Sequence, residues 1–336
     1  MKIEDIQPEW LTELLRAGGS LPSGAVAAVQ VNRSSRHFST VAQLQVQYTA
    51  DAPSTAPTAL FLKSSNRLSE LVFHAEVQPT LRDAPALRCL GSRVDQEETW
   101  LLFDDMSGTH LSIPEHLPPT RAVYEQMVDC LAGLHVQRWE DARMRERFAT
   151  RNGDPSYGFL FKQTLGAFGA FVDALADRLS DERRALYERV LAVWPRMCLE
   201  RIQQGRGVTM LHGDAHPWNF MLPRPGQAGR LFLADWADWR FDSGTQDLAF
   251  LVSLPCFPEQ RARMEQELVR RYCQRLNEGG VRYSWEECWL DYRKSVIGNL
   301  LFPVFWWSLG SPSSIWWPNL ERAVLAFQEL GCEELL

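Results

Sequence analysis

The segment from 211 to 253 constrains the fold and the chemistry of this chain more than any other stretch. It places Asp214 five residues before Asn219 and later brings a second acid, Asp235, at the end of an apolar run. Residues 223–229 are rich in Pro and Gly and have the composition of a turn, and apolar residues flank them. This pattern predicts a hairpin that returns Asp235 to the side of Asn219, so that two carboxylates and an amide converge.

These side chains in this order suit phosphoryl transfer. The transferred group carries negative charge on its non-bridging oxygens, so catalysis depends on positioning and on charge neutralisation. Mg²⁺ prefers oxygen ligands and is usually held by one or two protein groups together with phosphates and water. Asn219 and Asp235 are therefore the candidate metal ligands. Asp214 is the candidate catalytic residue that accepts or orients the proton of the attacking hydroxyl.

A second interpretation takes His212, Asp214 and His216 as ligands of Zn²⁺ or Fe²⁺. A hydrolytic metal site usually needs further His or Asp ligands downstream, and no histidine follows His216 in the sequence. We therefore prefer a structural role for His212 and a solvent-side position in the loop for His216.

The run HGDAHPWN, followed by ADW, a glycine and DLA, resembles the aminoglycoside phosphotransferase and choline kinase family, a bilobal relative of the protein kinases. The resemblance implies an α+β, protein-kinase-like fold with a small antiparallel-sheet N-lobe and a larger, mostly helical C-lobe. It implies a nucleotide-binding lobe at 1–103, a hinge at 104–107, and a helical lobe at 108–336 that carries the catalytic loop and the acceptor site.

By the same resemblance, Asp247 lies on a helix and supports the catalytic loop by hydrogen bonds to its backbone, and His212 has a supporting role in that loop. The alternative for Asp247 is a first-turn acid that interacts favourably with the positive end of the helix dipole. Both interpretations can hold together.

The predicted strand 58–63 is apolar and ends in Lys63, and it resembles the VAIK strand of kinases. A lysine at the end of an apolar strand needs an anionic partner or an exit to water. We expect Glu76 to be that partner, because Phe73-x-x-Glu76 matches the helix of the family, and Glu70 is the alternative. The resemblance implies that the paired lysine contacts the α- and β-phosphates of the nucleotide.

Two further parts of the predicted nucleotide site come from the kinase-like fold. The polar hairpin between strands 26–32 and 39–48 would cover the phosphates, but it lacks the glycines of the protein kinases. Backbone N–H groups of Ser34 and Ser35 would replace them, and an ordinary polar hairpin is the alternative. After strands at 88–94 and 99–103, the adenine edge would bind backbone groups of three hinge residues. These residues are Asp104, Asp105 and Met106.

The thirteen tryptophans raise the question of an aromatic acceptor pocket. Aromatic cages bind quaternary amines through cation–π attraction worth roughly 0.5–2 kcal/mol each. Trp239, Trp306 and Trp316 are the candidates, and packing in the core is the alternative. Choline-like, aminoglycoside-like and steroid-like alcohols stay open as acceptors. The sequence Trp-Ala-Asp-Trp after the metal strand favours the ecdysteroid-kinase-like branch.

The composition of the chain limits which kinds of partner and which cellular compartment are expected. The net charge of −7 and the lack of Lys or Arg runs argue against a nucleic-acid partner. Seven scattered cysteines without a CxxC motif suggest free thiols in a reducing compartment, and the N-terminus lacks the apolar core of a signal peptide. We expect a cytoplasmic protein with no membrane span and no obligate protein partner.

The predicted function is therefore that of a small-molecule kinase that uses ATP and Mg²⁺ to phosphorylate a hydroxyl of a small alcohol or amino alcohol. The alternative is a nucleotide-binding pseudokinase without turnover. The sequence disfavours a protein kinase, because it lacks the Gly-rich hairpin, the arginine of an HRD motif and an activation loop that ends in APE.

Overall fold

The computed structural model describes residues 3, 6–35, 40–95, 98–114, 117–149 and 158–336. The chain divides into two compact units. The first unit comprises 1–111 and 221–237, and the second comprises 112–220 and 238–336. Segment 221–237 thus lies in the same unit as the N-terminal sheet, although it follows the catalytic loop in sequence. The hinge assigned to 104–107 stays a prediction.

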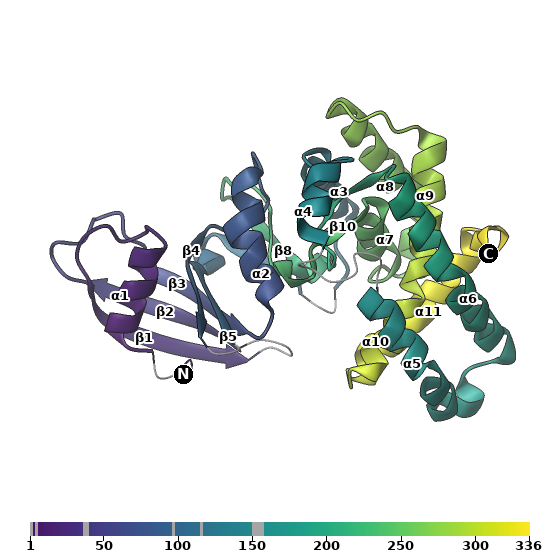
Figure 1. The fold of residues 1–336 in the computed structure, drawn as a ribbon, viewed down its shortest axis with the longest axis horizontal. Coiled ribbons are helices and arrows are strands. Elements are labelled where there is room, and N and C mark those ends of the chain that lie inside the picture. The colour runs from purple at the N-terminus through teal and green to yellow at the C-terminus, as the bar shows by residue number, and fades with distance from the viewer. Residues whose placement is uncertain (1–2, 4–5, 36–39, 96–97, 115–116, 150–157) are drawn as a thin grey trace. The chain divides into compact units, whose positions relative to one another are not determined.

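The first unit is built on a five-stranded antiparallel sheet in the order β1-β2-β3-β5-β4 (Figure 1). All five predicted strands are confirmed, with ends that differ by at most three residues. The observed strands are Val26–Ser35 (β1), Thr40–Tyr48 (β2), Ala59–Ser65 (β3), Cys89–Asp95 (β4) and Glu98–Asp104 (β5).

Helix α1, Pro8–Ala17, covers this sheet because its apolar residues lie on one side. Leu11, Leu14 and Leu15 are almost fully buried in the core that α1 forms with the strands. The helix approaches β4 so closely that only glycine fits at the contact. A Cβ atom at Gly18 would lie 1.9 Å from the carbonyl oxygen of Leu90.

After β3 the chain forms the short helix α2, Leu68–Val72, which continues directly into a π-helical turn at Phe73–Val77. π-helical turns are rare and occur often at functional sites. This turn shifts the angular positions of all residues that follow Val72. It therefore changes the position of Glu76, whereas Glu70 precedes the turn and keeps its place in the α-helical segment.

Two small sheets contain strands from the segment 211–253 and from its neighbours in sequence. Strands β6 (His110–Ser112), β8 (Phe220–Pro223) and β9 (Phe232–Leu233) form one sheet in the order β6-β8-β9, which confirms the hairpin predicted from the turn at 223–229. Strand β7 (Val208–Leu211) pairs antiparallel with β10 (Arg240–Ser243). Strands β6 and β10 were not predicted.

The second unit is mostly helical. Within it, α3 packs against α8, α5 against α10, and α7 against α9 (Figure 1). Its helices are Arg121–Val136 (α3), Ala142–Ala149 (α4), Gly158–Leu175 (α5), Asp181–Gln204 (α6), Thr245–Ser253 (α7), Pro258–Glu278 (α8), Trp285–Asn299 (α9), Leu301–Ser308 (α10) and Ser313–Glu329 (α11). The architecture confirms the predicted α+β class.

Local signals explain several helix ends. Ser284 and Glu287 form a capping box at the start of α9. This helix ends at Asn299, and α10 begins at Leu301. Pro318 lies inside α11 rather than at its first turn, because the helix begins at Ser313. Among the described residues, no helix combines the length and the apolar character that crossing a bilayer requires.

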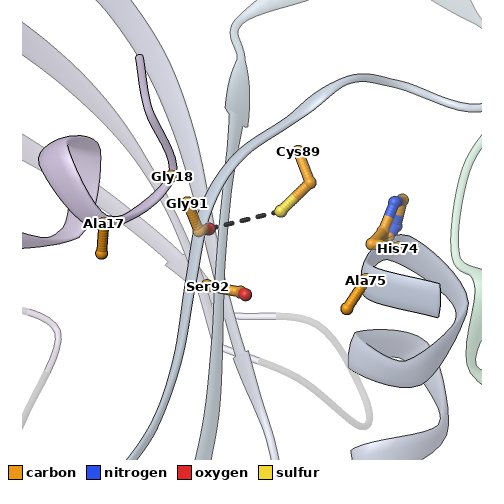
Figure 2. A pocket seen from close by; sticks show the side chains of 7 residues that line it. All are labelled: Ala17, Gly18, His74, Ala75, Cys89, Gly91 and Ser92. Carbon is orange, nitrogen blue, oxygen red and sulfur yellow. Dashed lines mark hydrogen bonds between the residues drawn. The ribbon is translucent and has the colours of Figure 1, made fainter. Parts of the chain in front are cut away.

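A small cavity of about 190 Å³ lies in the first unit between α1, β4 and the π-helical turn (Figure 2). The thiol of Cys89 donates to the carbonyl oxygen of Gly91 at 3.3 Å at its edge, and His74 lies across from it. Its lining contains none of the residues predicted for nucleotide, metal or acceptor.

Candidate active site

Asp214 lies in the loop that follows β7, and the residue before it, Gly213, has a backbone conformation that favours glycine. Gly213 has a φ of 86°, in the left-handed region. A Cβ atom at this position would lie 2.0 Å from the carbonyl oxygen of Asp238. The glycine of the HGD motif is therefore required by backbone conformation and by the close approach of a neighbouring segment.

Asp247, in the first turn of α7, fixes this loop from within the second unit. Its carboxylate accepts hydrogen bonds from the backbone amides of His212 at 2.7 Å and Gly213 at 2.9 Å. It also lies 3.2 Å from Nε2 of His135, whose Nδ1 bonds the hydroxyl of Tyr272 at 2.7 Å. All of these groups are buried. The loop backbone is thus held by hydrogen bonds to the core of the unit.

Electrostatics keep Asp247 ionised despite its burial. Burial by itself raises the pKa of this carboxyl group, but the hydrogen bond and charge of His135, with further contributions from His212 and Arg240, outweigh it. The net effect is a pKa below the ordinary value. A carboxylate is an acceptor only, which matches the two amide donors that face it.

Asp214 and Asn219 are bonded to each other at the two ends of the loop. The side-chain Nδ2 of Asn219 donates to the backbone oxygen of Asp214 at 2.8 Å and to its carboxylate at 3.1 Å. His216 approaches the same carboxylate, with Nε2 at 3.5 Å. In the part of the chain that the structure describes, Oδ1 of Asn219 accepts no hydrogen bond. That oxygen is therefore available to a cation.

The first unit holds the other half of the predicted site. Nζ of Lys63 lies 2.6 Å from Glu70 and 2.7 Å from Asp235. Lys63 and Glu70 are almost fully buried, whereas the side chain of Asp235 is 46% exposed. Burial alone would lower the pKa of Lys63, but the charges of Glu70 and Asp235 raise it above the ordinary value. Lys63 is therefore an ammonium group that lies between the side chains of Glu70 and Asp235.

The prediction that Glu76 pairs with Lys63 was wrong, and the observed partner is Glu70. Glu70 lies in the α-helical segment that follows β3, whereas Glu76 lies in the π-helical turn and is part-exposed. The added residue in a π turn rotates later positions, so a pattern that assumes regular α-helix places Glu76 wrongly.

Asp235 has a φ of 65°, which is uncommon for a residue other than glycine. Neighbouring contacts within the first unit hold this conformation. The ring of Trp236 stacks on Phe73 with centroids 3.9 Å apart, and its Nε1 donates to the carbonyl oxygen of Leu233 at 2.7 Å. The hydroxyl of Ser69 donates to the carbonyl oxygen of Ala237. The helix that supplies Glu70 therefore also positions Asp235.

The remaining residues of the predicted nucleotide site lie at strand ends of the first unit. Ser34 and Ser35 are the last residues of β1, opposite Val41 and Thr40. The tip of that hairpin, 36–39, is outside the described residues. Asp104 ends β5, and the backbone amide of Asp105 donates to the carbonyl oxygen of Ala59 at 3.1 Å. That amide is used within the protein, which leaves other groups of 104–106 for adenine.

The three tryptophans predicted for the acceptor pocket differ in burial. Trp239 is buried against Phe148, and Trp316 is buried against Phe171. Trp306 is partly exposed and contacts Phe250 and Phe302. Packing accounts for Trp239 and Trp316, whereas Trp306 keeps ring surface that a ligand can contact.

Sequence reasoning missed two contacts of the catalytic loop. The guanidinium of Arg240 donates to the carbonyl oxygen of Gly213 at 3.3 Å, and His216 lies between Asp214 and the ring of Phe250. Arg240 is far from Gly213 in the chain, and Phe250 is far from His216, so no local pattern marks these two contacts. The position of Arg240 at the start of β10 could have been found only by predicting the pairing with β7.

Comparisons with known proteins identify the family of this chain. The profile described as the phosphotransferase enzyme family matches residues 54–285, more than half of the chain. The match covers the Lys63 strand, the loop at 212–219 and Asp247. A comparison with the sequences of curated proteins found no match.

Several solved structures share the fold at low sequence identity. An ethanolamine kinase of Plasmodium vivax is 10% identical with a TM-score of 0.57, covering 90% of this chain and 82% of that chain. A choline kinase of Cryptosporidium parvum is 12% identical with a TM-score of 0.55, covering 92% and 90%. A microcompartment-associated aminopropanol kinase is 12% identical with a TM-score of 0.57, covering 90% and 92%. These likenesses confirm the predicted kinase-like fold.

Proposed function

Because the chain belongs to the phosphotransferase enzyme family, we propose that it transfers the γ-phosphate of ATP to a hydroxyl group of a small alcohol or amino alcohol. The structures that share its fold include kinases named for ethanolamine, choline and aminopropanol, which supports a small hydroxyl compound as acceptor. In the reaction, the acceptor oxygen bonds to the γ-phosphorus as the bond to the departing ADP oxygen breaks. The hydroxyl proton passes to a base and then to solvent.

The observation that carries this proposal is the loop with Asp214 and Asn219 bonded to each other and anchored by buried Asp247. A general base must lie within hydrogen-bond reach of the proton that it accepts, and it must be held in place. Asp214 is partly exposed, whereas the backbone behind it is bonded to the core. This arrangement suits a carboxylate that receives the proton of an incoming hydroxyl.

The residues present also fit a divalent cation. Asn219 has an oxygen that is not used in the described part of the chain, and Asp235 is a half-exposed carboxylate at the end of a strand. Hard oxygen donors of this kind are what Mg²⁺ prefers. When bound, Mg²⁺ would neutralise phosphate charge. Lys63, oriented by Glu70, would bind phosphate oxygens of the nucleotide.

We further propose a cytoplasmic location and no nucleic-acid, membrane or obligate protein partner. All seven cysteines are free thiols, and five of them are buried. Free thiols persist in reducing compartments. The net charge of −7 does not favour binding to a polyanion.

The substitution Asp214→Asn tests the catalytic role. We expect a fall in kcat of about 10²- to 10⁴-fold, because positioned acid–base groups contribute that much, with nucleotide affinity retained. Asp181→Asn is the control, since Asp181 is an exposed carboxylate in the first turn of α6. Phosphorus NMR measures transfer to a panel of alcohols, and calorimetry measures nucleotide binding.

Two results would contradict the proposal. Undiminished transfer by Asp214→Asn would remove this residue from the reaction. Tight nucleotide binding by the unaltered protein without transfer to any alcohol would favour the pseudokinase alternative.

A further inference from the structure

A continuous series of aromatic rings leads away from the catalytic loop within the second unit. We call these five residues the aromatic wall: His216, Trp218, Phe250, Phe302 and Trp306. The ring of His216 lies 5.1 Å from that of Trp218 and 6.4 Å from that of Phe250, measured between centroids. Phe250 lies 4.7 Å from Phe302, and Phe302 lies 5.5 Å from Trp306. The series therefore begins at the side chain that approaches Asp214.

The central residue of the aromatic wall is buried, and the residues on either side of it are partly exposed. Phe250 is buried in α7. His216, Trp218, Phe302 and Trp306 are each partly exposed. Apolar ring surface that stays in contact with water beside a candidate catalytic carboxylate is suited to bind the apolar part of a ligand.

The helices that carry this surface are almost without charge. Phe250 lies on α7, and Phe302 and Trp306 lie on α10. In the sequences of these two helices the only ionisable side chain is Asp247. Its carboxylate is buried and is used by the loop backbone and His135. Arg240 adds a positive charge at the loop, since its guanidinium donates to the carbonyl oxygen of Gly213. The carboxylate of Asp214 lies beside His216, and the proposed function assigns it to the proton of the hydroxyl group. Apart from Asp214, α7 and α10 thus add no exposed carboxylate that could pair with an ammonium group.

Cation–π attraction alone does not offset the free-energy cost of binding an ammonium group without a carboxylate partner. A cation over an aromatic ring gains about 0.5–1 kcal/mol at an exposed site and about 2 kcal/mol when desolvated. Removing an ammonium group from water costs several kcal/mol unless a counter-ion is present. A neutral apolar group gains about 25 cal/mol for each Å² of surface removed from water and has no such cost.

We propose that the acceptor is a neutral alcohol with an apolar, aromatic or alicyclic body that packs on the aromatic wall, and not an ammonium alcohol. This inference rests on the proposed function and narrows it to one substrate class. It sets this chain apart from the choline, ethanolamine and aminopropanol kinases that share its fold.

Pairs of alcohols that differ only in charge test the proposal on the full chain. The first pair is choline and its neutral carbon analogue, in which a carbon atom replaces the quaternary nitrogen. The second pair is phenylalaninol and phenylpropanol. Transfer from ATP gives kcat/KM for each alcohol, and calorimetry without nucleotide gives binding. We expect the neutral member of each pair to have at least a tenfold higher kcat/KM and tighter binding.

Variants locate the effect on the wall. Trp306→Ala should lower kcat/KM for the neutral alcohols at least tenfold and leave the KM for ATP unchanged. The matched control is Trp289→Ala, since Trp289 is a partly exposed tryptophan that stacks on Trp285 and Tyr292 in α9. Phe302→Glu should move the preference towards the cationic member of each pair, because it adds the missing carboxylate.

The outcomes separate this inference from the proposed function. Faster transfer to choline or phenylalaninol than to the neutral partners would overturn the inference and leave the kinase function intact. Absence of transfer to all four alcohols, with tighter binding of the neutral ones that Trp306→Ala removes, would overturn the kinase function and support the ligand class. Equal binding by the Trp306→Ala variant and the unaltered protein would overturn the inference.

Discussion

Lys63 lies between two carboxylates, and the two are not equivalent. Glu70 is buried with it, whereas Asp235 is half exposed. Removing one partner of a buried ion pair is strongly destabilising, because it leaves a charge without compensation in a site of low polarity. Glu70 therefore fixes the ammonium group, and Asp235 keeps surface for a ligand.

At the residue scale we predict that Glu70→Gln lowers kcat/KM for ATP by about 10- to 100-fold, since a hydrogen bond to a charged group contributes about 1.5–3 kcal/mol. Glu76→Gln is the matched control, because Glu76 lies six positions further along the same segment and does not contact Lys63. Steady-state kinetics measures both variants. Equal losses, or a larger loss from Glu76→Gln, would show that the kinetic role belongs to Glu76.

Local sequence patterns predicted which strands lie next to the candidate residues, but they did not predict all contacts of these residues. Lys63 lies within β3, Asp214 follows β7, and Asn219 directly precedes β8. The position of Glu76 depends on a π-helical turn, and nothing in LSELVFHAEV marks that turn. The burial of Trp239 and Trp316 depends on Phe148 and Phe171, which lie far away in sequence.

At the scale of elements, the π-helical turn carries a buried, titratable side chain. His74 is stacked edge-on against Phe73 and Phe103, and its Nδ1 bonds Oε1 of Gln78 at 2.7 Å. Burial, opposed in part by Gln78 and assisted by the charge of Lys63, lowers its pKa to about 4. Folding therefore favours the neutral imidazole.

We predict that the free energy of unfolding decreases as the pH falls from 6.5 to about 4, because the unfolded chain binds a proton that folded His74 resists. The direction of this change follows from the lowered pKa of His74. The neutral side chain contributes its full stabilisation above pH 6.5, and this contribution is lost as the pH falls through the folded-state pKa of about 4. The full change would be about 3 kcal/mol. Urea unfolding at several pH values measures it, and His74→Gln should flatten the curve. An identical slope for the variant would show that another group is responsible.

Element boundaries show which signals were local. The strands of the first unit were predicted to within a few residues, because the alternation of apolar and polar residues depends on neighbours in sequence. The break between α9 and α10 at Leu300 comes just before Pro303, which has no amide hydrogen for a helical bond to Asn299. The short strands β6 and β10 depend on tertiary pairing. Short strands have too few residues to show a pattern.

At the scale of the whole molecule, the residues predicted for nucleotide, metal and catalysis belong to two compact units. Lys63, Glu70 and Asp235 belong to the first, and Asp214 and Asn219 belong to the second. The connection at Phe220 and Met221 passes from one unit to the other between the two candidate metal ligands.

The central claim is that Asn219 and Asp235 bind the same metal ion, and a double-mutant cycle tests it most directly. The affinity for Mn²⁺ with a non-hydrolysable ATP analogue is measured by electron paramagnetic resonance for the unaltered protein, Asn219→Ala, Asp235→Asn and the double variant. Ligands of one ion are coupled, so the double variant should lose less affinity than the sum of the single losses, by about 0.5–3 kcal/mol. If the losses of Mn²⁺ affinity in the two single variants add up to the loss in the double variant, the two residues do not bind one ion. Unchanged affinity in either single variant would also contradict the shared metal site.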